Sequence, residues 1–177
     1  MGNIIKYLFR FALFILFQVF VLDKIVLHQM ITPYLYLLFI LWLPFKINRT
    51  LLMFIGFLTG FAIDSFRHNP GFHAAACVLI AYLRPFIINL LIPQEGADTN
   101  YDEPSIKSMG SLPAYFFYIA LLCFLHNFWL FLLEAWQFGN IWYFLVKTLL
   151  STLVSLLLIL ITELLFNRKQ RYRTNTV

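Results

Sequence analysis

Long runs of apolar residues divide this 177-residue chain. A helix needs roughly 17–25 mostly apolar residues to cross a lipid bilayer. Six runs have about this length, and none alternates apolar with polar residues as membrane-spanning strands do. The second run is short and opens with Pro33, which a helix tolerates in its first turn. The sequence therefore predicts six transmembrane helices, at about residues 4–22, 31–45, 50–66, 72–92, 112–133 and 141–166.

The composition agrees with a membrane protein. Hydrophobic residues make up 62% of the chain and charged residues 12%, whereas soluble domains carry about 25% charged residues. A chain this small leaves much of its surface exposed, so it could not remove so many apolar groups from water. This excludes a soluble globular protein, a disordered chain and a disulfide-rich secreted module. We expect one all-α transmembrane domain over residues 1–177, with Cys77 and Cys123 as buried packing residues inside apolar runs.

The basic residues predict the orientation of the helices. With the N-terminus in the cytoplasm, cytoplasmic segments hold nine of the 13 basic residues, and outside segments hold only Lys24 and Arg67. The nine are Lys6, Arg10, Lys46, Arg49, Lys107, Arg168, Lys169, Arg171 and Arg173. Because cytoplasmic loops are enriched in positive charge, we expect both termini in the cytoplasm. The net charge of +5 then reflects topology and a basic tail at residues 167–177 facing anionic lipid, not nucleic-acid binding.

The longest polar connection is at residues 93–111. Its proline, glycine and asparagine content predicts an irregular loop. Its charged residues are Glu95, Asp98, Asp102, Glu103 and Lys107. Acidic residues weigh little in membrane orientation, so the loop is still expected in the cytoplasm. Two interpretations stay open: a solvated connector, or a docking surface for a cytoplasmic partner.

The densest cluster of unusual residues lies where the third predicted helix meets the fourth. Gly56 and Gly60 form a G-x-x-x-G pattern, and Asp64 follows four residues later on the same helix face. Small residues at this spacing let another helix approach closely. Arg67 and His68 lie one turn beyond Asp64, within reach of its carboxylate.

A tight turn is predicted at Asn69-Pro70-Gly71, followed by a fourth helix that opens with small residues. Two interpretations fit this hairpin: two closely packed helices around a satisfied aspartate, or a face on which Asp64 binds a partner. A metal site is not expected, because Asp64, His68 and His73 are spaced across the turn in a way that matches no compact site.

Other polar residues fall inside the predicted helices. Arg84 and Lys147 lie near helix ends, where long side chains snorkel to the membrane surface or find a partner. For His126 and Asn127, deep in the fifth helix, we expect an interhelical hydrogen bond, with a proton relay as a remote alternative. The remaining such residues are Gln18 and Glu163. No nucleophile, base and orienting group occur together, so we expect no enzymatic activity and no cofactor.

The hairpin resembles the MreD family, the bacterial rod shape-determining membrane proteins. The resemblance rests on G-F-L-T-G-F-A-I-D-S-F and on P-G-F-H-A-A-A-C-V-L-I-A-Y-L-R. The positions that match the family pattern are Gly56, Gly60, Asp64, Gly71, Ala74, Tyr82 and Arg84, with Tyr-Leu-Arg one residue tighter than is typical. Pro33 and the run after it resemble the family's second helix. The six predicted spans and the lack of a soluble domain agree with the family along the whole chain. Only the hairpin of about 35 residues is specific to the family.

The resemblance implies a non-enzymatic subunit of the cell-elongation complex in the bacterial cytoplasmic membrane. Such a subunit works with MreC, the MreB filament, the RodA glycosyltransferase and a class B penicillin-binding transpeptidase. From the glycine face that ends at Asp64, we expect a transmembrane helix of a partner, MreC above all, to dock on the third and fourth helices. Arg67, Gly71, Tyr82 and Arg84 belong to this expected surface.

A second function stays open. The family is similar in fold to the six-helix substrate-binding components of vitamin transporters. Asp64, Arg67, His68 and His73 cluster near the predicted outer face, where a vitamin-like solute could be captured. A ligand that co-purifies with the protein would favour this alternative.

Overall fold

The computed structural model describes residues 2–25, 31–92, 103–106, 108–135 and 141–165. This part of the chain contains helices and no strand. The helices are α1 (Gly2–Phe20), the 3-10 helix η1 (Leu22–Lys24), α2 (Leu37–Leu41), α3 (Arg49–Arg67), α4 (Phe72–Leu91), α5 (Leu112–Ala135) and α6 (Ile141–Leu165). Five of them, α1 and α3 to α6, are long and apolar enough to cross a membrane. The predicted all-α, multi-pass membrane fold is thereby confirmed.

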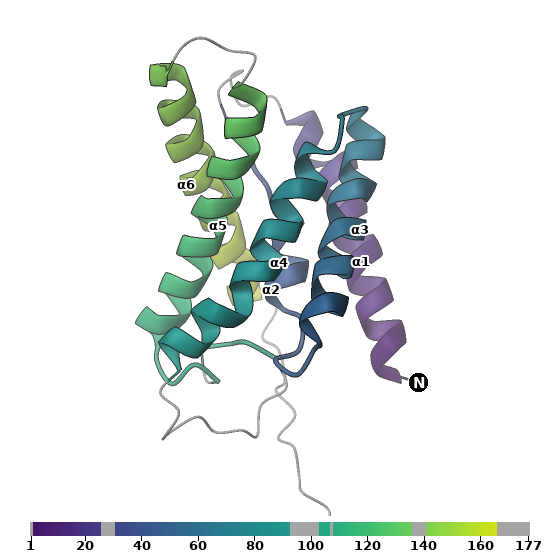
Figure 1. Cartoon of the computed structure of the whole chain (residues 1–177), viewed down its shortest axis with the longest axis vertical. Coiled ribbons are helices and arrows are strands. Elements are labelled where there is room, and N and C mark those ends of the chain that lie inside the picture. Colours follow the sequence, from purple (N-terminus) through teal and green to yellow (C-terminus); the bar gives the residue numbers. More distant parts are fainter. Residues whose placement is uncertain (1, 26–30, 93–102, 107, 136–140, 166–177) are drawn as a thin grey trace, which may run out of the picture.

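The helices form a bundle with two ends. In Figure 1, α1 and α3 begin at the lower end, and α3 joins α4 through a tight turn at the upper end. Neighbouring helices α3 and α4, α4 and α5, and α5 and α6 pack in sequence across the bundle. Cys77 and Cys123 are buried and unpaired, as expected.

The prediction of a second transmembrane helix at residues 31–45 is wrong. Residues 32–35 have no regular secondary structure, and α2 is only five residues long. The backbone N–H groups of this stretch bond to side chains of other helices instead. The N–H of Tyr34 donates to Ser155 Oγ at 2.9 Å, and the N–H of Leu35 donates to Gln18 Oε1 at 2.9 Å. A helix is unnecessary here because neighbouring side chains satisfy the backbone, which is what allows irregular backbone at membrane depth.

This segment nevertheless passes through the bundle beside α6. Its Thr32 N–H donates to Ser151 Oγ at 3.1 Å, and Trp42 Nε1 donates to Glu163 Oε2 at 3.1 Å. The twelve residue steps of α6 from Ser151 to Glu163 rise by about 18 Å, more than half of a hydrocarbon layer of about 30 Å. Every residue from 34 to 43 is buried. The segment is therefore the core around which the longer helices pack.

The described part of the long polar loop closes the lower end of the bundle. Glu103 accepts hydrogen bonds from Lys6 Nζ at 2.6 Å and from Arg10 at 3.0 Å. Ser105, Ser108 and Met109 of the same loop are buried. This part is packed and is not a solvated connector. Residues 93–102, Lys107 and the predicted basic tail at 167–177 lie outside the described residues.

Candidate functional site

Asp64 joins α3 to the beginning of α4. Its carboxylate oxygens accept the backbone N–H groups of His73 at 3.2 Å and Ala74 at 2.8 Å. A negative charge at a helix N-terminus satisfies unpaired N–H groups and is favoured by the helix dipole. The side chain is 3% exposed. Two helices therefore pack closely around this aspartate, as one of the two interpretations of the hairpin expects.

The two glycines of α3 face α4 of the same chain. A Cβ atom on Gly60 would lie 2.4 Å from the Cα of Ala74, and one on Gly56 would lie 2.9 Å from the carbonyl oxygen of Cys77. The glycine face is thus filled from within. The expectation that a partner helix packs onto this face is wrong, because α4 already occupies it. A partner would have to use the outer side of the hairpin.

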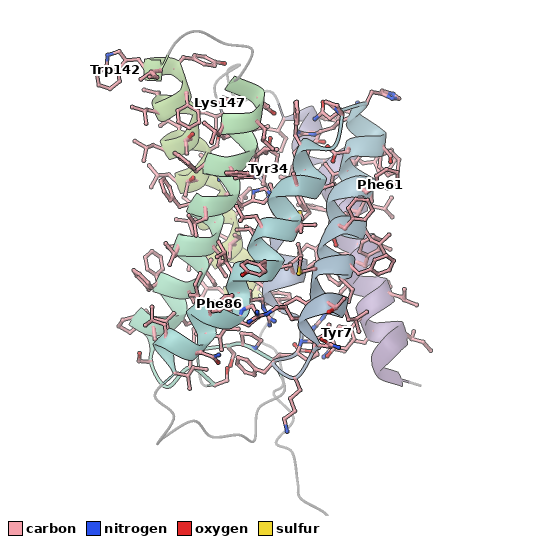
Figure 2. The ribbon with its side chains drawn as sticks, in the orientation of Figure 1. Tyr7, Tyr34, Phe61, Phe86, Trp142 and Lys147 are labelled. Atoms are coloured by element: carbon pink, nitrogen blue, oxygen red, sulfur yellow. The ribbon has the colours of Figure 1, made fainter. Side chains whose placement is uncertain are left out.

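The outer side of the hairpin holds a groove of about 1040 Å³, here called the hairpin groove. Phe57 and Phe61 of α3 form one wall, and Tyr82 of α4 with Trp129 of α5 lines another part. Figure 2 shows Phe61 projecting away from the bundle. The rest of the lining is contributed by Met53, Asp64, Ser65, His68, Asn69, Pro70, Gly71, Ala74, Ala75, Val78 and Leu79. Among the predicted site residues, Asp64, Gly71 and Tyr82 line this groove.

Arg67 belongs to a different cluster. Its Nε donates to Asp23 Oδ2 at 2.8 Å, and its Nη1 donates to the Tyr34 hydroxyl at 3.2 Å. The expected pairing of Asp64 with Arg67 is replaced by an ion pair between Arg67 and Asp23 of η1. The reason is that the Asp64 carboxylate is directed to the N–H groups at the beginning of α4. Asp23 carried no signal in the sequence, because its proximity to Arg67 depends on how α1 packs on α3.

A chain of hydrogen bonds continues from Arg67 into the core. The Tyr36 hydroxyl lies 2.8 Å from His73 Nδ1 and 2.8 Å from His126 Nε2. His126 Nδ1 lies 3.2 Å from Asn127 Oδ1, and Asn127 Nδ2 donates to Thr152 Oγ1 at 3.1 Å. The expected interhelical hydrogen bond of the His126–Asn127 pair is confirmed. It ties α5 to α6 and, through Tyr36, to α4.

The direction of these hydrogen bonds follows from the first donor, Arg67. Arg67 Nη1, 3.3 Å from His73 Nε2, can only donate, so His73 must carry its proton on Nδ1. His73 then donates to the Tyr36 oxygen, and the Tyr36 hydroxyl donates to His126 Nε2. His126 in turn holds its proton on Nδ1 and donates to Asn127. Both imidazoles are assigned as neutral Nδ1–H tautomers, and each hydrogen bond from Arg67 to Thr152 then pairs one donor with one acceptor.

Arg84 is buried near the lower end of the bundle and does not snorkel. It is 1% exposed, and its Nε donates to the Tyr118 hydroxyl at 3.0 Å. Its guanidinium also donates to the carbonyl oxygens of Leu43 and Pro44, just after α2. Arg84 therefore fixes the end of the core segment and does not reach the hairpin groove. Lys147, inside the sixth predicted span, pairs with Glu134 at 2.6 Å.

Comparison with protein-family models, with curated proteins and with solved structures finds no match for this chain. The buried polar side chains are bonded to one another and hold the fold, whereas the hairpin groove offers an accessible surface.

Proposed function

We propose that this chain is a non-enzymatic integral membrane subunit of the bacterial cell-elongation complex. In this proposal it lies in the cytoplasmic membrane, binds MreC and helps to position peptidoglycan synthesis by RodA and a class B penicillin-binding transpeptidase. The lower end of the bundle would face the cytoplasm and the MreB filament. The resemblance of the hairpin to the MreD family supplies these identities.

The observation that carries the proposal is the hairpin groove. It lies on the outer side of the segment that bears the family resemblance, and Asp64, Gly71 and Tyr82 line it. Gly56 and Gly60 contribute indirectly, because they bring α4 close to α3. Groove walls with exposed aromatic side chains facing the bilayer suit a membrane-embedded protein partner.

Capture of a small solute, the alternative, is less well supported. Asp64 is bonded to the N-terminus of α4, and Arg67 is paired with Asp23. His73 is bonded to Tyr36 and is fully buried. Three of the four residues suggested for solute capture are thus engaged within the chain. Only His68 lines the hairpin groove with its side chain exposed.

Co-purification with MreC tests the proposal. Ser65→Trp fills the hairpin groove from an exposed position on α3, and Leu153→Trp places the same bulk on the exposed face of α6. We expect MreC to be recovered with the wild-type chain and with the Leu153 variant, and much less with the Ser65 variant. No recovery of MreC with the wild-type chain would refute the proposed function.

The neighbouring genes give an independent check. Coding regions for MreB and MreC beside this one would support the proposal. A neighbouring pair of transport ATPases, together with a ligand that co-purifies, would favour the solute-binding alternative.

A further inference from the structure

We infer that the hairpin groove receives a single transmembrane helix with small residues on one face and a hydrogen-bond donor about one turn from its upper end. The donor would be the side chain of Lys, Arg, Ser or Thr. This inference deepens the proposed function by giving the chemistry of the partner, and it does not depend on the partner being MreC.

The dimensions of the groove suit one side of a helix. Its lining along α3 extends from Met53 to Ser65, twelve residue steps that rise by about 18 Å, or more than three helical turns. A volume of about 1040 Å³ over that length corresponds to a cross-section of roughly 60 Å², against roughly 80–110 Å² for a helix 10–12 Å in diameter. The groove is therefore wide enough to take the face of a helix but not to enclose one.

The surface of the groove has ridges and a low floor. The rings of Phe57 and Phe61 stack at 5.8 Å and form a ridge on α3. Ala74 and Ala75, at the beginning of α4, form a floor of small side chains beside it. Helices associate in lipid through close packing, because lipid tails are as apolar as the helices themselves. A partner with small residues on its facing side can bring its backbone over the floor between the ridges.

Asp64 supplies the charge complementarity at the upper end. An ionised carboxylate offers about four acceptor positions, and the N–H groups of His73 and Ala74 occupy one position on each oxygen. The guanidinium of Arg67 is directed to Asp23. Among the described residues no other hydrogen bond reaches these oxygens, so acceptor positions remain on Asp64, which lines the groove although only 3% of the residue is exposed. A donor on the incoming helix satisfies them, whereas an acyl chain carries no donor.

The test uses two designed helices reconstituted in phosphatidylcholine vesicles with the full chain. Both are polyleucine helices with a stripe of alanine at i and i+4, and one of them carries a lysine one turn from the upper end. Energy transfer between labels reports binding. We expect the lysine helix to bind about threefold to tenfold more tightly, as measured for interhelical hydrogen bonds in membranes. We expect Asp64→Asn to remove this preference.

Ser65→Trp should weaken the binding of both helices, and Leu153→Trp should weaken neither. Thermal unfolding of each variant shows whether it is folded. A photoreactive benzoylphenylalanine at Phe61 should cross-link to the lysine helix, and one at Leu153 should not. Equal binding of the two helices, insensitivity to Ser65→Trp, or adducts at Phe61 only with lipid or with a second copy of the chain would overturn the inference.

A third helix, the transmembrane segment of MreC, separates this inference from the proposed function. Binding of the lysine helix without binding of the MreC helix would leave the inference standing and remove the proposed partner. Recovery of MreC that is insensitive to Ser65→Trp, together with equal binding of the two designed helices, would leave the proposed function standing and remove the inference.

Discussion

At the scale of single residues, Gly60 has the most constrained position in the hairpin. A Cβ atom there would lie 2.4 Å from both the Ala74 Cα and the His73 carbonyl oxygen, which are backbone atoms of α4. Backbone cannot rotate away as a side chain does, so the helices would have to separate. At Gly56 the clash is milder, with the nearest atom at 2.9 Å.

We therefore predict that Gly60→Ala lowers the free energy of unfolding by about 1–3 kcal/mol, the usual cost of overpacking, and that Gly56→Ala costs less. Unfolding in detergent measures both. Ser65→Ala, on the exposed side of the same helix, serves as the control and should change little. Equal stabilities for the Gly60 and Gly56 variants would contradict the close packing described here.

Tyr36 is the second residue on which much depends, because its hydroxyl links two buried histidines. We predict that Tyr36→Phe lowers the free energy of unfolding by about 1–3 kcal/mol, since it leaves buried polar atoms of His73 and His126 without partners. Nitrogen NMR of the imidazoles should show neutral Nδ1–H tautomers for both histidines in the wild-type chain. A charged imidazole or an Nε2–H tautomer at either position would contradict the assigned direction of the hydrogen bonds from Arg67 to Asn127.

At the scale of secondary structure, residues 31–43 form a largely irregular segment where the sequence predicted a transmembrane helix. It is held by side chains of α1 and α6, above all by Gln18. The Gln18 amide bonds to the N–H of Leu35 at 2.9 Å and to the carbonyl oxygen of Pro33 at 2.9 Å. One side chain thus replaces the backbone bonds that a helix would have made.

Gln18→Met keeps a similar volume but removes these bonds. We predict faster amide hydrogen exchange at Leu35 and a loss of about 1–3 kcal/mol for each buried group left unsatisfied. Ser155→Ala, which affects only the N–H of Tyr34, should have a smaller effect. The idea fails if exchange at Leu35 stays as slow as in the wild-type chain.

At the scale of the whole molecule, Glu103 closes the lower end of the bundle. Burial opposes its ionisation, but hydrogen bonds and charge from Lys6 and Arg10 together hold the pKa of its carboxyl below the ordinary value of 4.5. A carboxyl with a lowered pKa stabilises the folded state at pH values above its unfolded pKa, and this contribution is lost as the pH falls through the folded pKa.

We predict that the contact between this loop and α1 persists at neutral pH and loosens as the pH falls below about 4.5. Hydrogen exchange at residues 105, 106, 108 and 109, followed between pH 6 and pH 3 with correction for intrinsic rates, measures the effect. Glu103→Gln should remove the pH dependence and leave the loop loosened throughout. An acid transition that persists in this variant would show that another group is responsible.

The sequence by itself determined the class of fold. Lengths of apolar runs are set by the thickness of the bilayer, and five of six predicted spans correspond to helices of spanning length. It also placed Asp64 beside the hairpin turn, because helical spacing puts Gly56, Gly60 and Asp64 on one face. The hydrogen bond of His126 was expected because an unpaired polar group is costly in lipid.

The tertiary structure decided which partners these residues have. Residues 31–45 are as apolar as a transmembrane helix. Their backbone N–H groups, however, bond to the side chains of Ser151, Ser155 and Gln18, which come from distant parts of the sequence. The glycine face could have packed within the hairpin or received a partner helix, and in the structure α4 fills it. Spacing along one helix shows which residues share a face, but only packing in three dimensions decides what covers that face.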